Sequence, residues 1–209
     1  MHTVLALDIG FNHTGMAAFK VISEQPHVLL AVDCLHTEEL EDSKVSISDV
    51  LRAVRSYTWI RNNYREHDCS VIACELPTAG TKDSRAARCM GIISGVIASV
   101  CAELQCPVIW ITPDESRAAG GWIKKEHLIP KPDTTGMRAS ERKKLLAEHA
   151  RALSRRNAEL KNLVMQNMEK RYPIISGMKK KDKEHIADAL ATFEAAVVKG
   201  LPTTNILRG

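Results

Sequence analysis

The sequence predicts a single α/β domain over residues 1–209, with a mixed five-stranded β-sheet flanked by α-helices. Three observations support this fold class. Segments with strand and helix patterns follow one another in the order β-β-β-α-β-α-β-α. The length of 209 residues suits one substantial core. The chain has only three Trp, three Tyr and three Phe, so aliphatic side chains must fill that core, which favours packed layers over an aromatic-rich barrel.

The first three predicted strands form an antiparallel meander. The apolar run Thr3–Asp8 is typical of a buried strand, and Gly10 begins the turn that follows it. Further strands are expected at Gly15–Val21 and His27–Asp33. Asp8 therefore lies at the end of a buried strand.

Helices and strands then alternate along the chain. Apolar residues recur at helical spacing through Val50–Tyr64, with Ser46 or Ser48 as the expected N-cap. A buried strand follows at Cys69–Glu75, and a helix at Asp83–Leu104. Glu75 thus also lies at the carboxyl end of a strand.

The last third of the chain is mainly helical. A strand at Pro107–Ile111 precedes a short helix at Pro113–Ala119, which has Pro at its first position. Trp122–Met137 has no clear periodicity and is expected to be a loop. Long helices are predicted at Ala139–Arg171 and Lys183–Lys199.

Composition restricts the environment and the partners of the protein. No apolar run approaches the roughly 20 residues that cross a bilayer, and the N-terminus lacks the features of a signal peptide, so we expect a cytoplasmic protein without a membrane partner. The six cysteines contain no C-x-x-C pair, and we expect most of them to be small buried side chains rather than disulfide or zinc ligands.

The charge is unevenly distributed. The net charge is +4, but residues 1–123 carry −5 and residues 124–184 carry +9. The basic part, which contains a predicted helical insertion at about 138–180, is a candidate surface for a polyanion. A solvated helical face explains this charge equally well.

Four residues are candidates for a catalytic metal site. Asp8 and Glu75 end buried strands, and a three-residue spacing places His185 and Asp188 on one face of the last helix. Each of them alone has an ordinary explanation, such as a turn-capping or solvated side chain. Together, carboxylates from two strand ends and one helix are the hard oxygen ligands that divalent cations prefer.

These motifs resemble those of the RuvC-type Holliday junction resolvases. Asp8-x-Gly with Thr14 and Gly15 resembles the first-strand motif of that family, and Glu75 resembles its second catalytic acid. The run HIADALA resembles its C-terminal motif, in which Asp or His precedes the last acid by three positions. The resemblance extends, in the same order, over most of the chain and implies an RNase H-like fold.

The resemblance also implies a function. It implies a crossover junction endodeoxyribonuclease that resolves Holliday junctions or other branched DNA in recombination, repair or replication. Two Mg²⁺ ions, which Mn²⁺ can replace, would be held by Asp8, Glu75 and Asp188, with His185 as a further ligand or a group that positions water. Nicking opposed strands needs two active sites, so a homodimer is expected, with the helix Asp83–Leu104 as a candidate contact.

Basic residues complete the implied DNA surface. Arg117 resembles a contact to the DNA backbone, and Arg142 or Lys143 resembles the basic position near the scissile phosphate. A loop at Lys179–Lys183 is expected to bring further ammonium groups to the DNA. The predicted DNA-binding residues are Arg117, Arg142, Lys143, Lys144, Lys179, Lys180 and Lys181.

Three departures from the family pattern and two alternatives remain. Residues 76–78 lack the aromatic wedge of many members, and residues 150–180 form a longer helical insertion. His185 makes the site less acidic than the Asp found at this position in many members. These departures fit a divergent, phage-encoded member in a bacterial or phage-infected cytoplasm. A non-cleaving protein that binds branched DNA is one alternative. An actin-like or sugar-kinase ATPase is the other, because these proteins also begin with Asp-x-Gly-x-x-x-Thr-Gly, although 209 residues do not supply their two lobes.

Overall fold

A five-stranded mixed β-sheet forms the centre of the computed structural model, which describes residues 2–23, 25–39, 44–75, 84–122 and 129–201. The strands are β1 (His2–Ile9), β2 (His13–Val21), β3 (Val28–His36), β4 (Val71–Glu75) and β5 (Val108–Ile111). They lie in the order β3-β2-β1-β4-β5. The first three strands are antiparallel to one another, whereas β1, β4 and β5 are parallel. The predicted fold class and the meander are confirmed.

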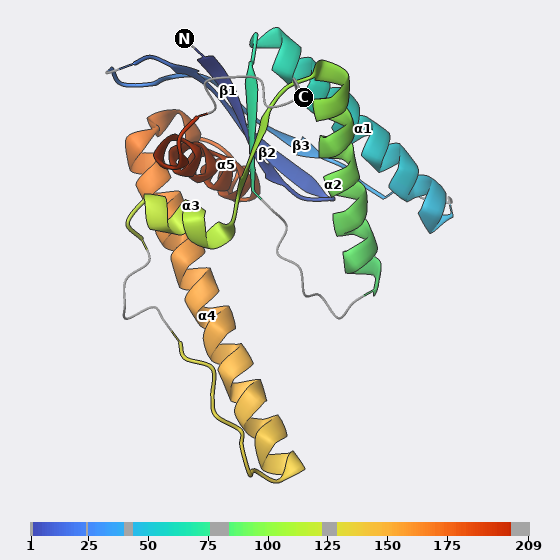
Figure 1. The fold of residues 1–209 in the computed structure, drawn as a ribbon, viewed down its shortest axis with the longest axis vertical. Helices are drawn as coiled ribbons and strands as arrows, with labels where there is room; N and C mark the ends of the chain where they lie inside the picture. The colour runs from blue at the N-terminus through green and yellow to red at the C-terminus, as the bar shows by residue number, and fades with distance from the viewer. Residues whose placement is uncertain (1, 24, 40–43, 76–83, 123–128, 202–209) are drawn as a thin grey trace.

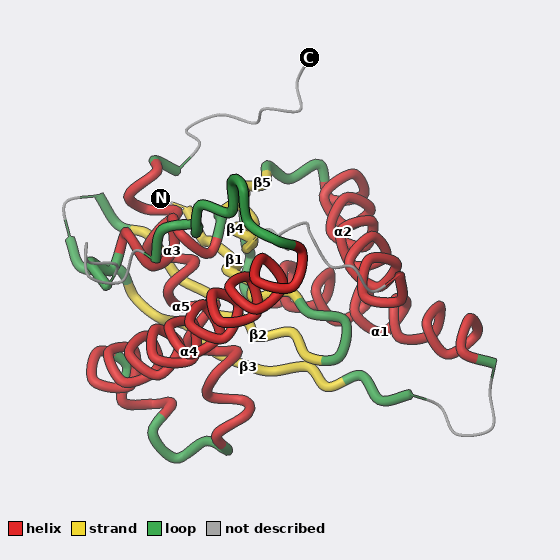
Figure 2. The backbone as a smooth tube through the Cα atoms, turned by 90° about the horizontal axis from the view of Figure 1, so that it is seen from below, coloured by secondary structure: helices red, strands yellow, loops and turns green. Residues whose placement is uncertain are grey.

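Helices cover both faces of the sheet (Figure 1). They are α1 (Val45–Glu66), α2 (Ser84–Leu104), α3 (Pro113–Ala119), α4 (Ala139–Arg171) and α5 (Lys180–Lys199), with a 3₁₀ turn η2 (Pro173–Ile175) before α5. Seen from below in Figure 2, α1 and α2 lie on one side of the sheet, and α3, α4 and α5 lie on the other.

Strand alternation divides the core into two layers. Val4 and Ala6 of β1 belong to the apolar cluster under α5, whereas Leu5 and Leu7 belong to the cluster under α1 and α2. Successive side chains of a strand point to opposite faces, so Asp8 continues the set that faces α5. The acid at the end of β1 is thereby directed to one defined side of the sheet.

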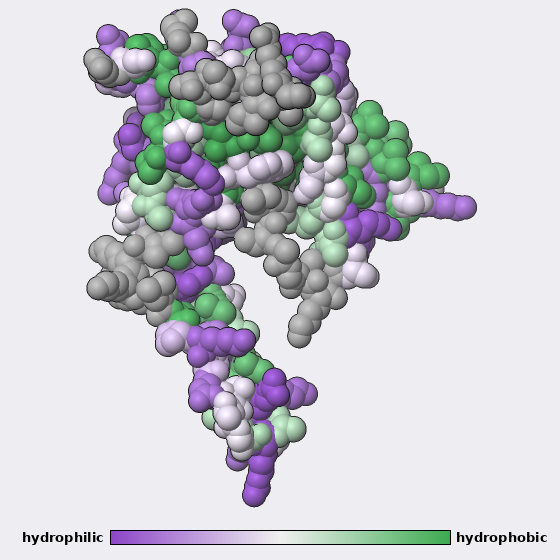
Figure 3. Space-filling model, in the orientation of Figure 1, coloured by the Kyte–Doolittle hydropathy of each residue, from purple (hydrophilic) through white to green (hydrophobic). Residues whose placement is uncertain are grey.

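Helix α4 is a projecting arm. Its C-terminal part packs on the body of the protein through buried Leu160, Val164 and Met168. Its N-terminal part extends away from the sheet (Figure 1), and hydrophilic side chains gather along that part of the surface in Figure 3. The predicted insertion at about 138–180 thus contains both a core-packing segment and an exposed, basic one.

Two predicted helix starts are wrong. Helix α1 begins at Val45, because the carbonyl of Lys44 accepts hydrogen bonds from the backbone N–H groups of Ile47 (2.8 Å) and Ser48 (3.1 Å), so neither predicted serine is the N-cap. Helix α5 begins at Lys180 rather than Lys183, because the N–H of Lys183 already donates to the carbonyl of Lys179 at 2.9 Å. The expected lysine loop is therefore mostly the first turn of α5.

Helix α2 differs from the compositional expectation. By length and composition alone it could cross a membrane, a test that the core helix of a soluble protein also passes. One of its faces packs on the sheet through residues that include Ile93 and Ile97. Cys69, Cys74, Cys101 and Cys106 are buried and free, as expected, whereas Cys34 and Cys89 are half-buried.

Candidate active site

Asp8 and Glu75 lie side by side at one edge of the sheet. The parallel strands β1 and β4 are in register up to the pair Leu7–Cys74, and each acid is the next residue of its strand. Val4 and Ala6 face α5, as do Val71 and Ala73 of β4. Both acids therefore continue the alternating sets that point toward α5.

Helix α5 supplies the other two predicted residues, and a glycine allows it to approach. His185 Nδ1 lies 2.7 Å from Asp8 Oδ2. Gly15 of β2 pairs with Asp8 in the sheet, and a Cβ at Gly15 would overlap the backbone carbonyl of His185 and lie 2.9 Å from the nitrogen of Ile186. The absence of a side chain at this position lets the helix backbone rest directly on the strand.

The carboxylates are electrostatically coupled. Burial, together with the charges of Asp8 and Asp188, raises the pKa of Glu75 to about 8. Burial and the charge of Asp8 raise the pKa of Asp188 to about 7. The hydrogen bond that His185 donates to Asp8 raises the pKa of His185, against the lowering effect of burial.

This donor set fits a divalent cation. Raised carboxyl pKa values mean that the site holds negative charge at a cost, which a bound cation would remove. Among the four predicted residues, the structure records a direct contact only between Asp8 and His185, within the part of the chain that it describes. Asp8 and Asp188 lie close enough to Glu75 to raise its pKa, and the oxygens of these acids are hard ligands of the kind that divalent cations prefer.

Lys161 is a basic residue of the site that the sequence analysis missed. Its ammonium group lies 2.6 Å from Glu184 Oε1 and 3.8 Å from Asp188 Oδ2. Burial lowers the pKa of Lys161, but the hydrogen bond with Glu184 and the charge of Asp188 outweigh this and raise it. Lys161 belongs to α4, and no sequence spacing relates it to the acids on other elements.

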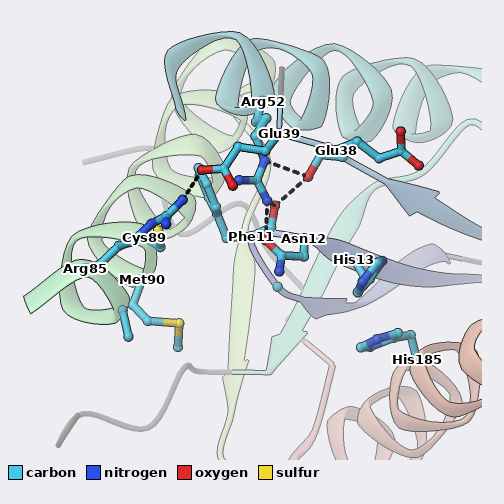
Figure 4. Close-up of a pocket in the computed structure, with 13 residues that line it drawn as sticks. Phe11, Asn12, His13, Glu38, Glu39, Arg52, Arg85, Cys89, Met90 and His185 are labelled. Carbon is cyan, nitrogen blue, oxygen red and sulfur yellow. Dashed lines mark hydrogen bonds and ion pairs between the residues drawn. The ribbon is translucent and has the colours of Figure 1, made fainter. Parts of the chain in front are cut away.

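A pocket adjoins the site on the side of α1 and α2 (Figure 4). It is bounded by the turn after β1, by α1 and α2, and by His185. Arg52 of α1 fixes this turn, because it donates a hydrogen bond to the carbonyl of Phe11 at 3.4 Å and its guanidinium lies 4.2 Å from the centre of the Phe11 ring. His13 faces His185, with 5.3 Å between ring centroids.

The predicted DNA-binding residues lie in three places. Arg117 is near the acids, since its charge lowers the pKa of Glu75. Lys179 caps α5, and Lys180 and Lys181 lie in its first turn, where Lys181 is close enough to lower the pKa of His13. All three lysines are exposed.

The third group lies far from the acids. Arg142, Lys143 and Lys144 are exposed in the first turns of α4, at the end of the projecting arm (Figure 1). At 1.5 Å per residue, Lys144 is about 25 Å along the helix from Lys161. The structure therefore separates this trio from the acids, and Lys161 occupies the position next to the acids that Arg142 or Lys143 was expected to hold. Residues 76–78, where the aromatic wedge is missing, lie outside the described residues.

Comparison with known proteins bears on the fold. No protein-family model matches the sequence, and no curated protein matches it. Thermus thermophilus RuvC in complex with a Holliday junction substrate is similar in structure, with a TM-score of 0.58 and 16% identity over 95% of this chain and 96% of that one. A second Thermus thermophilus RuvC structure has a TM-score of 0.56, 16% identity and the same coverage. These similarities confirm the predicted RNase H-like fold.

Proposed function

We propose that this chain is a metal-dependent endonuclease that cleaves branched DNA, with Asp8, Glu75 and Asp188 as its catalytic carboxylates. The observation that carries this proposal is the convergence of two strand-end acids and one helix-borne acid on one site, with raised pKa values for Glu75 and Asp188. The fold supports branched DNA as the substrate, because a RuvC with the same fold has been seen in complex with a Holliday junction substrate.

The metal in this proposal is Mg²⁺, with two ions and with Mn²⁺ able to substitute. Bound ions would supply Lewis-acid stabilisation of the phosphate oxygens and lower the pKa of an attacking water. Asp8 of β1, Glu75 of β4 and Asp188 of α5 would hold these ions. All three provide oxygen ligands, which suit Mg²⁺.

The chain's own residues orient and neutralise the reacting groups. Asp8 holds His185 through the 2.7 Å contact to Nδ1, which leaves the Nε2 atom of His185 to bind metal or orient water. Lys161 and Arg117 place positive charge beside Asp188 and Glu75 respectively, where the negative charge of a cleaved phosphate would develop.

Two basic surfaces would contact the DNA away from the cleaved bond. Lys179, Lys180 and Lys181 lie at the start of the catalytic helix α5, and Arg142 to Lys144 lie at the end of the α4 arm. A homodimer in the cytoplasm would present two such sites to opposed strands. Exposed apolar residues of α1, among them Val50 and Val54, extend the candidate dimer surface beyond α2.

Cleavage of labelled branched and linear DNAs, with Mg²⁺ or with Ca²⁺, tests this proposal. We expect paired, symmetric nicks on four-way junctions with Mg²⁺, and binding without cleavage with Ca²⁺. Junction binding without cleavage under all metal conditions would favour the non-cleaving DNA-binding alternative. ATP hydrolysis without any DNA binding would favour the ATPase alternative.

Removal of the Lys161 charge should slow cleavage of bound DNA. We expect Lys161→Gln to lower the single-turnover rate about tenfold, less than the ~100-fold for a buried charge-stabilising donor, because this side chain is 45% exposed. Affinity for the junction should change by only a few fold. Lys170→Gln, at an exposed position of the same helix, is the control. Equal cleavage rates for the two variants would show that Lys161 does not take part in cleavage.

The metal-free protein should lose stability as the pH rises. The folded-state pKa of Glu75 is about 8, above its value of about 4.3 in an unfolded chain, so protonated Glu75 favours the fold and this contribution disappears as the pH rises toward 8. Asp188 acts in the same direction up to about pH 7. We therefore expect Glu75→Gln to be more stable than the wild type in EDTA at about pH 8, and equally stable at about pH 4.

Thermal melts with and without metal measure this effect. Mg²⁺ should raise the wild-type Tm more at about pH 8 than at about pH 6, because fewer protons then compete for the carboxylates. Glu75→Gln should show a smaller rise at both values. In EDTA, a wild-type Tm that increases from about pH 6 to about pH 8, while the Tm of Glu75→Gln does not, would contradict the raised pKa of Glu75.

The lysines at the start of α5 should contribute to the salt dependence of DNA binding. In Lys179→Ala/Lys180→Ala/Lys181→Ala, each lost phosphate contact should reduce the slope of log K against log salt by about 0.9. Fluorescence anisotropy with junction DNA at several salt concentrations measures this slope. The matching triple variant of Arg142, Lys143 and Lys144 tests the arm separately. An unchanged slope in the first variant would show that its lysines are solvated and do not touch DNA.

A further inference from the structure

A cysteine, a histidine and an aspartate gather beside α5, on residues that the proposed nuclease mechanism does not use. Cys34 and His36 are two residues apart on the edge strand β3, so their side chains lie on the same face of the sheet. Asp182 lies in the first turn of α5. The thiol sulfur, a ring nitrogen and a carboxylate oxygen of these three residues lie within 4.8 Å of one another.

We propose that Cys34, His36 and Asp182 form a binding site for a thiophilic divalent cation, Zn²⁺, distinct from the proposed magnesium site. Zn²⁺ takes thiolate, imidazole and carboxylate ligands in tetrahedral sites. Three protein ligands would leave a fourth position for water. No other group of three or more such ligand atoms this close together occurs in the part of the chain that the structure describes.

The donor set separates this site chemically from that of Mg²⁺. Asp8, Glu75 and Asp188 offer oxygen atoms only, which suit Mg²⁺, whereas Cys34 adds sulfur, which Mg²⁺ does not favour. Burial and the charges of Asp182, Asp33 and Asp8 raise the pKa of Cys34 to about 12. The thiol therefore keeps its proton until a cation that binds sulfur strongly displaces it.

The geometry requires only small adjustments for a metal. His36 Nε2 lies 2.6 Å from Asp182 Oδ1, a hydrogen bond that holds the two ligands together without a metal. Zinc–ligand bonds of 2.0–2.3 Å in a tetrahedron separate ligand atoms by roughly 3.3–3.8 Å. His36 and Asp182 would move apart by roughly 0.7 Å, and the Cys34 sulfur already lies within 4.8 Å of both of their ligand atoms.

A second histidine supports His36 in the way that metal-binding imidazoles are usually supported. His13 Nδ1 lies 2.9 Å from His36 Nδ1, so one ring donates a hydrogen bond to the other. Burial and the charge of Lys181 lower the pKa of His13, which favours its neutral form as the acceptor. A bound metal would displace the proton through which His36 Nε2 bonds to Asp182, and His36 would keep the proton on Nδ1 that it donates to His13.

The position of the site defines its role. Cys34 and His36 pair in the sheet with Gly15 and His13 of β2. A metal held by β3 and by the first turn of α5 would link the start of the catalytic helix to the edge of the sheet. Its ligand from α5, Asp182, lies three residues before His185. Zn²⁺ should therefore stabilise the protein thermally, by an amount set by its concentration and affinity.

Co²⁺ is the spectroscopic probe for this site, because Zn²⁺ is spectroscopically silent. The full chain is titrated with Co²⁺ in saturating Mg²⁺ and a phosphine reductant. We expect the near-ultraviolet charge-transfer band of cobalt bound to thiolate, and loss of that band on addition of Zn²⁺. Cys34→Ser should abolish the band, whereas Cys89→Ser, which changes the other half-buried cysteine, should retain it.

Asp182→Asn gives a second test that leaves the thiol in place. Loss of a residue that only hydrogen-bonds to a metal ligand weakens metal binding ~10–100-fold, so loss of the ligand Asp182 should weaken Co²⁺ binding by at least this factor. The rise in Tm with Zn²⁺ should also become smaller. Glu75→Gln should retain both responses, which keeps this test independent of the nuclease proposal. Absence of a thiolate band in the wild type, or its persistence in Cys34→Ser, would overturn the assignment.

Discussion

Asp8→Asn should abolish cleavage of branched DNA while junction binding stays within a few fold of the wild type. In the proposed site, Asp8 contacts His185 of α5 and ends the strand that pairs with the strand of Glu75, and its carboxylate would help to hold the metal. Loss of a ligand that supports several kcal/mol of transition-state stabilisation corresponds to a rate loss of about 1,000-fold or more. The basic DNA-binding surfaces are not changed, so the affinity should be preserved.

The measurement combines single-turnover cleavage with a gel-shift titration of the same junction in Ca²⁺. Asparagine keeps an oxygen that can accept the 2.7 Å hydrogen bond from His185, so the local fold should persist. Asp133→Asn, in the exposed loop before α4, is a control for the loss of one negative charge. Parallel losses of binding and cleavage in Asp8→Asn would indicate a structural role for Asp8 and would count against the catalytic assignment.

Gly15→Ala should displace the catalytic helix. A Cβ at this position would overlap the backbone carbonyl of His185 and would lie 2.9 Å from the nitrogen of Ile186, so α5 as a whole must shift. Overpacking of this kind costs about 1–3 kcal/mol, which corresponds to a fall in Tm of roughly 2–12 °C in a protein of this size. A shift of about 1 Å in His185 and Asp188 should reduce cleavage about 100-fold.

Gly95→Ala is the matched control for this substitution. Gly95 lies in α2, and an added Cβ there would meet nothing within 4 Å. Alanine at this helical position should stabilise the protein by about 0.5–1 kcal/mol, so the Tm should rise in Gly95→Ala and fall in Gly15→Ala. Thermal melts and cleavage assays of both variants separate the close contact under α5 from a general intolerance to the loss of glycine. Normal activity and stability in Gly15→Ala would mean that α5 does not rest on β2 at this point.

Most of the secondary structure could be predicted from local pattern. Apolar periodicity and turn residues located all five strands and the helices to within a few residues, and α3 and α4 have the predicted bounds. The errors occurred at the starts of α1 and α5, where backbone hydrogen bonds to Lys44 and Lys179 begin the helices and no side chain marks the start. Helix ends depend on such contacts, which composition does not encode.

The candidate acids were also accessible from the sequence, because each lies at a position with a local signal. Asp8 and Glu75 interrupt apolar runs at strand ends, and the three-residue spacing of His185 and Asp188 follows from the period of a helix. Parallel pairing of β1 with β4 then brings the two strand-end acids to one edge.

Only the tertiary structure decided which residues from different elements surround these acids. Lys161 reaches Asp188 from another helix, Arg142 to Lys144 lie at the far end of that same helix, and Asp182 meets His36 across 146 positions of sequence. Local periodicity determines which face of an element is buried. The rotation of a helix about its axis, and its distance from the sheet, depend on the side chains of both packed elements. At Gly15 the lack of a side chain sets this distance, and such contacts form only when the core is assembled.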